Sequence, residues 1–345
     1  MKTKNFSYNI ISKYRSFLMG MAILSIIIFH YTVDCVNNAY NLKPHIVLYN
    51  NYIGSCGVDI FLFLSGFGLY YSFKKDSNQK NFYIKRFSKI LIPYFWVAIP
   101  TWFIKDILIL KLNFISFIKD LFFITFWENG TLWFWYILMI SICYLIFPYC
   151  FDYINGSHSK SKIINIFLFF TVLGIVFHLY NPELFSNIKI ALLRFPAFFI
   201  GSIIGKFSYE NRKIPKEACV LLFLAILLLS TKSSSTLVLS RYILGLFGIS
   251  FSILLAILLE LADQNNLKMT PIKKFVEWCG SYSLELYLTH VALRGFMNYY
   301  SFPTYRLRFE LVLVILSFSL SFILKKVSNV QSKRIWQALK KFGYS

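Results

Sequence analysis

Charged residues are scarce in this 345-residue chain, and acidic residues are the scarcest. Asp, Glu, Lys and Arg together make up 15% of the sequence, whereas about a quarter of a soluble domain is charged. Apolar residues make up 57% and aromatic residues 20%, and the mean hydropathy is +0.59. These values exclude a soluble enzyme and predict an integral membrane protein of the all-α class.

Metal-ligand patterns and a leader cleavage site are also missing. The six Cys form no CxxC pair, so we expect no metal site and no permanently bound cofactor. No small-x-small cleavage site follows the first apolar run, which predicts an uncleaved first span. The net charge of +21 does not indicate nucleic-acid binding, because the basic residues lie in short segments between apolar runs.

Ten long apolar runs predict a polytopic helical bundle of about ten membrane spans. They lie at 17–34, 54–73, 90–108, 132–151, 163–180, 190–206, 217–231, 240–262, 279–300 and 307–325. The shorter run 114–127 predicts an interfacial or re-entrant helix. With both termini cytoplasmic, the inner segments hold roughly three times as many basic residues as the outer ones. We therefore expect one domain, 1–345, in the inner (plasma) membrane, with a short basic cytoplasmic tail at 325–345.

Ionisable residues within the apolar runs are the candidate functional residues, because such groups are costly at membrane depth. His30 and Asp59 lie near the outer ends of the first two runs. Their matched depth predicts a catalytic pair in which the carboxylate orients the imidazole as a general base. Taken singly, His30 also fits a packing histidine and Asp59 a helix N-cap.

Basic residues gather at the cytoplasmic mouth of the third run. Arg86 and Lys89, joined by Arg15 at the foot of the first run, predict a phosphate-binding site for an anionic ligand. An ordinary positive-inside loop is the alternative. At the outer side, Trp133 and Tyr136 fit either an interfacial belt or the lining of a sugar site.

Three further ionisable residues fall within later runs. Arg194 lies in LLRFPAFFIGSIIG, and Glu285 and His290 lie in CGSYSLELYLTHVALRGF. Together with His30 and Asp59 they predict a polar cavity through the bundle.

The ordered set of these segments resembles the acyltransferase-3 family of bacterial integral membrane acyltransferases. The segments that carry the resemblance are MGMAILSIIIFH, GVDIFLFLSGF, FYIKRFSKILIPYF, LWFWYILMISICYLIFP, RFPAFFIGSIIG and GSYSLELYLTH. The family's first-span motif pairs a basic residue with a histidine eleven positions later. Here the histidine matches His30, but the earlier position is Met19, and Arg15 is the nearest basic residue.

The resemblance implies transfer of an acyl group, usually acetyl, from cytoplasmic acetyl-CoA to a hydroxyl of a cell-surface or exported glycan. The family's presumed catalytic residue matches His30, its basic cluster matches Arg86 and Lys89, and its late acidic position matches Glu285. Acetyl-CoA is then the acyl-donor co-substrate, and the residues expected to bind it are Arg15, Arg86, Lys89 and Glu285. His30 either activates the acceptor hydroxyl or carries the acyl group briefly. The transfer is completed by the membrane unit itself or by a separate extracytoplasmic partner.

Two other classes of protein fit part of this pattern. A transporter or flippase for a glycolipid or other anionic solute also needs a polar cavity and a basic cytoplasmic mouth, although we find no internal repeat of the kind many transporters show. A membrane-embedded structural subunit would use the intramembrane charges to hold helices together. Transfer of label from acetyl-CoA discriminates the enzyme from both.

Overall fold

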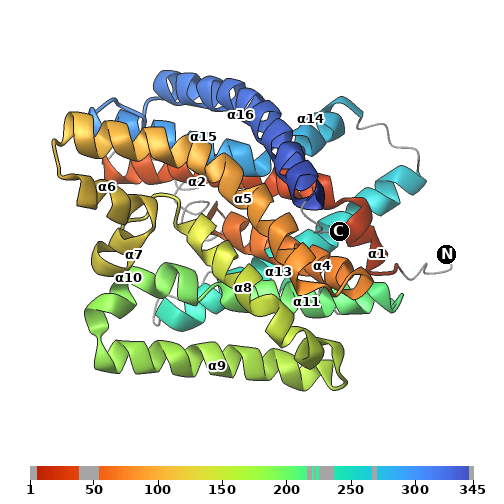
Figure 1. Cartoon of the computed structure of the whole chain (residues 1–345). Helices are drawn as coiled ribbons and strands as arrows, with labels where there is room; N and C mark the ends of the chain where they lie inside the picture. The colour runs from red at the N-terminus through yellow and green to blue at the C-terminus, as the bar shows by residue number, and fades with distance from the viewer. Residues whose placement is uncertain are drawn as a thin grey trace.

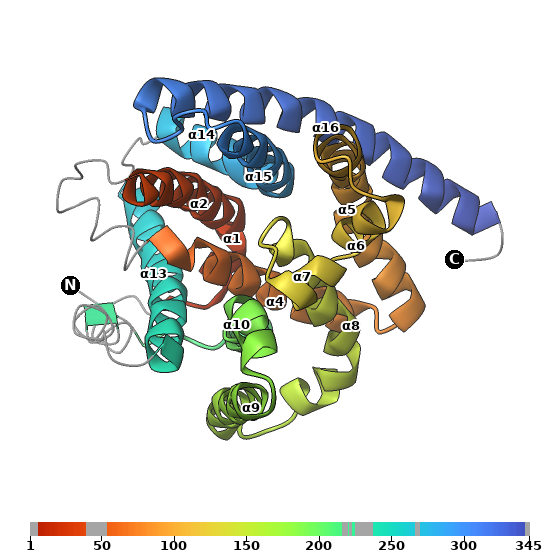
Figure 2. The same ribbon diagram turned by 90° about the vertical axis from the view of Figure 1, so that its left-hand side faces the viewer.

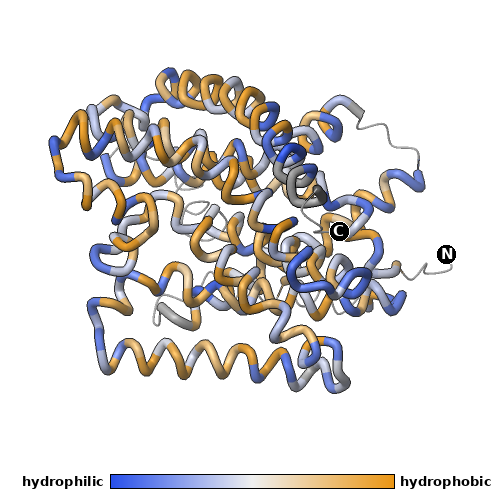
Figure 3. The backbone as a smooth tube through the Cα atoms, viewed as in Figure 1, coloured by the Kyte–Doolittle hydropathy of each residue, from blue (hydrophilic) through white to orange (hydrophobic). Residues whose placement is uncertain are grey.

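The computed structural model describes residues 6–38, 54–215, 220, 223–224, 237–265 and 270–341. The described chain is α-helical, and its one β-type contact is an isolated bridge between Ser7 and Lys213. The predicted all-α class is therefore confirmed. Apolar residues dominate the helix bodies, and hydrophilic residues gather towards the helix ends (Figure 3).

The helices pack roughly side by side into one bundle (Figure 1). In chain order they are α1 (Asn9–Lys13), α2 (Arg15–Asn37), η2 (Gly54–Cys56), α4 (Gly57–Lys75), α5 (Gln79–Trp102), η3 (Phe103–Ile109), α6 (Phe114–Leu121), α7 (Ile124–Asn129), α8 (Trp135–Asn155), α9 (Ser159–Tyr180), α10 (Pro182–Leu192), α11 (Phe195–Tyr209), α13 (Leu237–Gln264), α14 (Thr270–Ser281), α15 (Ser283–Tyr299) and α16 (Leu307–Lys341).

Eight of the predicted spans coincide with helices that are long and apolar enough to cross a membrane. The ninth predicted span corresponds to the 17-residue α15. The seventh, at 217–231, lies almost entirely outside the described residues. The helix α1 and the last turns of α16 lie at the same end of the bundle (Figure 1), which we call the terminal end, and we call the opposite end the distal end.

The run 114–127 forms two short helices, α6 and α7, at the distal end (Figure 1). The break between them falls at Phe123, whose φ of 62° lies in the left-handed region. A non-glycine residue in that conformation cannot continue a right-handed helix. The short, apolar segment predicted from the sequence is therefore a bent pair of helices rather than one continuous helix.

The helices α4 and α11 approach each other more closely than side chains would normally allow. Gly66 on α4 lies against the carbonyl of Phe198, and Gly201 on α11 lies against the carbonyl of Phe63. A Cβ at Gly205, one turn further along, would lie 2.6 Å from the carbonyl oxygen of Phe67. Small residues at such spacing let two membrane helices meet backbone to backbone. This contact fixes the position of α4 at the centre of the bundle.

Gly201→Ala is expected to destabilise the protein by about 1–3 kcal/mol, because the added methyl group would displace the backbone of α4. The matched control is Gly174→Ala on α9, where the new Cβ would make an ordinary 3.5 Å contact with Phe185. Thermal unfolding in detergent should show a lower melting temperature for the first variant and an unchanged or raised one for the second, since alanine favours helix. Equal melting temperatures would contradict the close contact.

Candidate active site

A cavity of about 390 Å³ opens in the distal half of the bundle. Its lining comes from α2, η2 and the start of α4, the segment before α8 with the first residue of α8, α10, Arg194 just before α11, and α15. Figure 2, which looks along the bundle from the distal end, shows these elements around its middle. The volume lies within the range of small-molecule sites. The lining residues used below are His30, Ser55, Trp133, Trp135, Arg194, Tyr287 and Arg294.

The candidate catalytic residue, His30, lies in this cavity and is stacked on His290. The two imidazole rings are nearly parallel, at 3°, with their centroids 5.2 Å apart. His290 is fully buried, and neither of its ring nitrogens has a hydrogen-bond partner in the described part of the chain. Nδ1 of His30 is likewise buried without a partner there. Nε2 is therefore the nitrogen of His30 left to meet a substrate.

The structure does not bring Asp59 and His30 together. The carboxylate of Asp59 accepts a hydrogen bond from Arg241, and its Oδ2 lies 3.7 Å from Nε of Arg194. All three side chains are largely buried. The predicted orientation of His30 by Asp59 is therefore corrected: the two residues share a depth, but Asp59 faces the two guanidinium groups.

A second buried ion pair lies behind the opposite wall of the cavity. Arg294 donates two hydrogen bonds to Asp34, one of them from Nε at 3.0 Å. The amide of Asn298 donates a third hydrogen bond to the same carboxylate at 3.3 Å. A guanidinium bound through two nitrogens is held in a fixed plane. Arg294 therefore presents a firmly positioned charge to the cavity.

The predicted phosphate-binding residues do gather at the terminal end. Arg15 contacts α4, where its guanidinium lies 3.5 Å from the position of a Cβ on Gly68. Arg86 and Lys89 on α5 lie close enough to Arg15 to interact with it electrostatically. Within the described residues none of the three has an ion pair with a carboxylate. Nε of Arg86 is buried without a hydrogen-bond partner there, so the cluster is an unneutralised cationic site.

Glu285, predicted to belong to that site, is placed elsewhere. It lies in the first turn of α15, and its carboxylate is 3.9 Å from Nζ of Lys325 on α16. The ion pair joins two neighbouring helices. The structure gives Glu285 a contact within the fold and brings it to none of the three cations of the cluster.

Hydroxyl groups connect the cationic cluster with the cavity. Tyr144 lies beside Arg15 and Arg86, and Ser65 lies between Tyr144 and Tyr136. The ring of Tyr136 meets that of Tyr287 edge to face at 5.5 Å, and Tyr287 lines the cavity. Tyr136 itself is buried just below the cavity rather than in its wall, so the predicted sugar-contacting role falls to other aromatic residues.

Aromatic side chains form much of the cavity wall. Trp133 lines the cavity, and so does its neighbour Trp135. Trp135 also lies against Arg194, with the guanidinium carbon 5.3 Å from the ring centroid. Such contacts stabilise a partly desolvated cation. Both tryptophans face the cavity, so a position in an interfacial aromatic belt does not by itself account for them.

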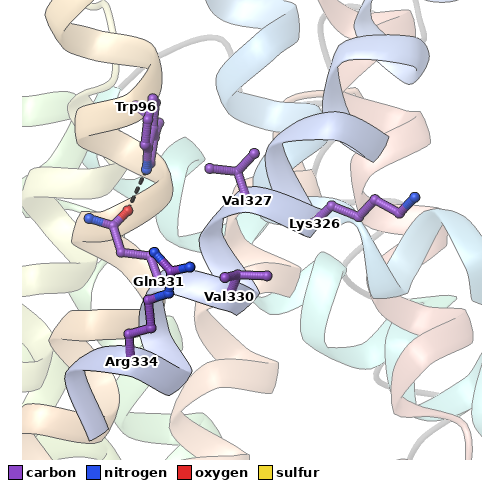
Figure 4. A pocket seen from close by; sticks show the side chains of 6 residues that line it. All are labelled: Trp96, Lys326, Val327, Val330, Gln331 and Arg334. Atoms are coloured by element: carbon purple, nitrogen blue, oxygen red, sulfur yellow. Dashed lines mark hydrogen bonds between the residues drawn. The ribbon is translucent and has the colours of Figure 1, made fainter. Parts of the chain in front are cut away.

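A larger, more open groove lies on the outside of the bundle, away from these groups. It measures about 590 Å³ and runs between α5 and α16, with the indole of Trp96 donating a 2.5 Å hydrogen bond to Gln331 (Figure 4). Its other lining residues are Lys326, Val327, Val330 and Arg334. Among the described residues that line this groove there is no carboxylate, histidine or cysteine.

The fold and the site define a polytopic membrane protein with a histidine-containing cavity at one end and a cationic site at the other. Residues 17–326 match the model of an acyltransferase domain, and the chain therefore belongs to the acyltransferase-3 family. It is a membrane-bound acyltransferase, as the members of that family are. No curated protein and no solved structure matches the chain.

Asp59→Asn is expected to lower the free energy of unfolding by about 3–5 kcal/mol, because it leaves two buried guanidinium groups without a countercharge. The matched control is Asp76→Asn. Asp76 pairs with Lys85 on the surface, where Lys85 and the backbone N–H of Asn78 lower its pKa, and solvent screens that pair. Detergent melting curves should separate the two variants, and a wild-type melting temperature for Asp59→Asn would contradict the assignment.

Proposed function

We propose that this acyltransferase takes an acetyl group from acetyl-CoA at the terminal end and transfers it to a hydroxyl of a cell-surface or exported glycan in the distal cavity. The observation that carries the proposal is the position of His30. It lines a cavity large enough for a sugar, and the helix that carries it begins with Arg15, about 22 Å away along the axis.

The cationic cluster supports an acyl-CoA donor. Arg15, Arg86 and Lys89 form a site of like charge without carboxylates in the described residues, which favours a ligand with several phosphates. The hydroxyl groups of Tyr144, Ser65 and Tyr136 then mark the route of the pantetheine arm, whose two amides need hydrogen-bond partners inside an apolar bundle. The thioester would reach the cavity beside Tyr287.

The charge distribution supports a cytoplasmic terminal end, because the segments assigned to that side hold more Lys and Arg than those assigned to the other. The donor then enters from the side where acetyl-CoA is found. The cavity with His30 faces the outer side of the plasma membrane, where an exported glycan is within reach. The acyl group crosses most of the membrane within the protein.

The chemistry assigned to His30 is general-base catalysis. Nε2 takes the proton of the acceptor hydroxyl while the hydroxyl oxygen attacks the thioester carbonyl. The carbon–sulfur bond breaks as the tetrahedral intermediate collapses, and the proton passes from the imidazolium to the CoA thiolate. His290, stacked on His30 at 5.2 Å, keeps the ring in one plane in place of the carboxylate expected from the sequence.

His30→Gln is expected to lower the rate of acetyl transfer by about a hundredfold to ten-thousandfold, since it removes the general base. The measurement is transfer of radiolabel from acetyl-CoA to surface glycan in membranes with equal amounts of the protein. His178→Gln is the matched control, because His178 lies exposed on α9, away from the cavity. Unchanged transfer by His30→Gln would overturn the assignment.

Arg86→Ala is expected to raise the KM for acetyl-CoA about tenfold or more with a smaller change in kcat, because a charge-assisted hydrogen bond to a phosphate is lost. The control is Arg212→Ala at the same end of the bundle, where Glu210 already pairs with the guanidinium at 2.7 Å. Kinetics against acetyl-CoA concentration make the comparison. An equal effect of the two variants would show that the cluster does not bind the donor.

A further inference from the structure

The distal cavity has a wall of positive charge. The basic residues that line it are Arg194, Arg294 and His30, and no carboxylate is among the described residues that do so. The acidic residues of this region, Asp34 and Asp59, lie behind the arginines that they contact. A substrate in the cavity therefore meets guanidinium groups and aromatic rings first.

The two arginines differ in how far their charge is neutralised. Arg294 has Asp34 as a partner in two hydrogen bonds. Arg194 shares Asp59 with Arg241, and Arg241 has the closer contact, since it hydrogen-bonds Asp59 and also donates to Ser55 at 3.3 Å. Two guanidinium groups thus compete for one carboxylate.

Asp59, Arg194 and Arg241 form a trio of buried charges, and Arg194 is the member whose charge is least neutralised. Its Nε lies 3.7 Å from Oδ2 of Asp59, which is an ion pair but too long for a hydrogen bond. Nη1 donates a 2.6 Å hydrogen bond to the carbonyl of Ile190, but Nε has no hydrogen-bond partner in the described part of the chain, and the side chain is only 8% exposed. Asp59 is the one carboxylate that acts on it there.

An unbalanced buried cation is costly in a bundle of low dielectric. The face of Trp135 offsets part of this cost, but a ring quadrupole is weaker than a full negative charge. An anionic group on a bound substrate would supply the missing charge and could accept two parallel hydrogen bonds from the guanidinium. The cavity is therefore complementary to a ligand with one acidic group.

We propose that the acceptor is an acidic sugar, whose carboxylate or phosphate binds Arg194 while a hydroxyl of the same molecule faces His30. The inference rests on the proposed function, which supplies the hydroxyl-bearing acceptor. Trp133, Trp135 and Tyr287 provide flat apolar surfaces for the sugar ring. The trio carries one net positive charge, which favours the binding of acidic over neutral glycans.

The test compares sugars that differ in one charged group. Methyl β-D-glucuronide, glucose 6-phosphate and methyl β-D-glucoside are titrated against the full-length protein in detergent, with tryptophan fluorescence as the signal. At least one acidic sugar should bind about tenfold more tightly than the glucoside, and the tighter of the two acidic sugars identifies the anion. Equal binding of all three, or no binding, would overturn the proposal.

Arg241→Gln sharpens the test, because Arg241 contributes the excess charge but does not line the cavity. Removing it leaves Arg194 paired with Asp59 as a neutral unit. The ratio of the affinities for the acidic and the neutral sugar should then fall to about one. Arg241→Lys keeps the charge and should retain the preference. Arg308→Gln, an exposed arginine at the distal end, is the matched control. A preference unchanged in Arg241→Gln would contradict the role of the trio.

Acetyl transfer to the same sugars separates this inference from the proposed function. If the acidic sugar binds more tightly but receives no label from acetyl-CoA, the acidic-sugar binding site stands and the proposed reaction fails. If all three sugars receive label at the same rate in a His30-dependent manner, the reaction stands and the acidic acceptor is refuted. Melting curves for each variant confirm that the comparison is made between folded proteins.

Discussion

The backbone contact between α4 and α11 is the constraint on which the rest of the structure depends. Gly66 and Gly201 allow it, because any side chain at either position would overlap a carbonyl of the other helix. The contact brings Asp59, near the start of α4, beside Arg194, which immediately precedes α11. A wider separation of these helices would leave the buried Arg194 without its carboxylate partner in an apolar bundle. The close approach of α4 and α11 therefore also determines which of these buried charges can pair.

The helix α2 connects the two functional ends of the molecule, and it is held in a similar way. Gly20 on α2 and Gly280 on α14 both lie against the backbone of the opposite helix. Arg15, at the start of α2, and His30, about four turns further along it, are thereby fixed relative to the bundle rather than carried on loops. A rigid helix that carries both a donor-binding residue and the proposed base sets the distance over which the acyl group travels.

The sequence predicted those features that depend on depth in the membrane. The spans follow from apolar length, and His30 and Arg194 are recognisable because ionisable groups are rare there. The partner of Asp59 could not be predicted in this way. Depth gives only the position of a residue along the membrane normal. The direction in which its side chain points depends on how each helix is rotated about its axis and on which helices adjoin it. Asp59 and His30 share a depth but face different neighbours.

The same reason explains which site residues were missed and which were misplaced. Arg241 and Arg294 carry the signal that identified Arg194, a guanidinium within an apolar run, and could have been included on that ground. Tyr287 could not have been identified from the sequence, because nothing in its local sequence distinguishes it from the other tyrosines. Glu285 was assigned by its position in a motif, but its nearest cation comes from Lys325, on a helix that the motif does not contain.

Several cations of the bundle are paired with carboxylates, whereas cations at both ends of the proposed reaction are not fully paired. Paired cations include Lys13 with Glu260, Lys105 with Asp106 and Asp120, Lys273 with Asp263, and Arg294 with Asp34. In the described residues, positive charge is left over at Arg15, Arg86 and Lys89 on one side of the bundle and at Arg194 on the other. A ligand with phosphate or carboxylate groups would supply the missing countercharge at both places. The two sites, with His30 in the same cavity as Arg194, fit the proposed donor and acceptor, which are both anionic and approach from opposite sides of the membrane.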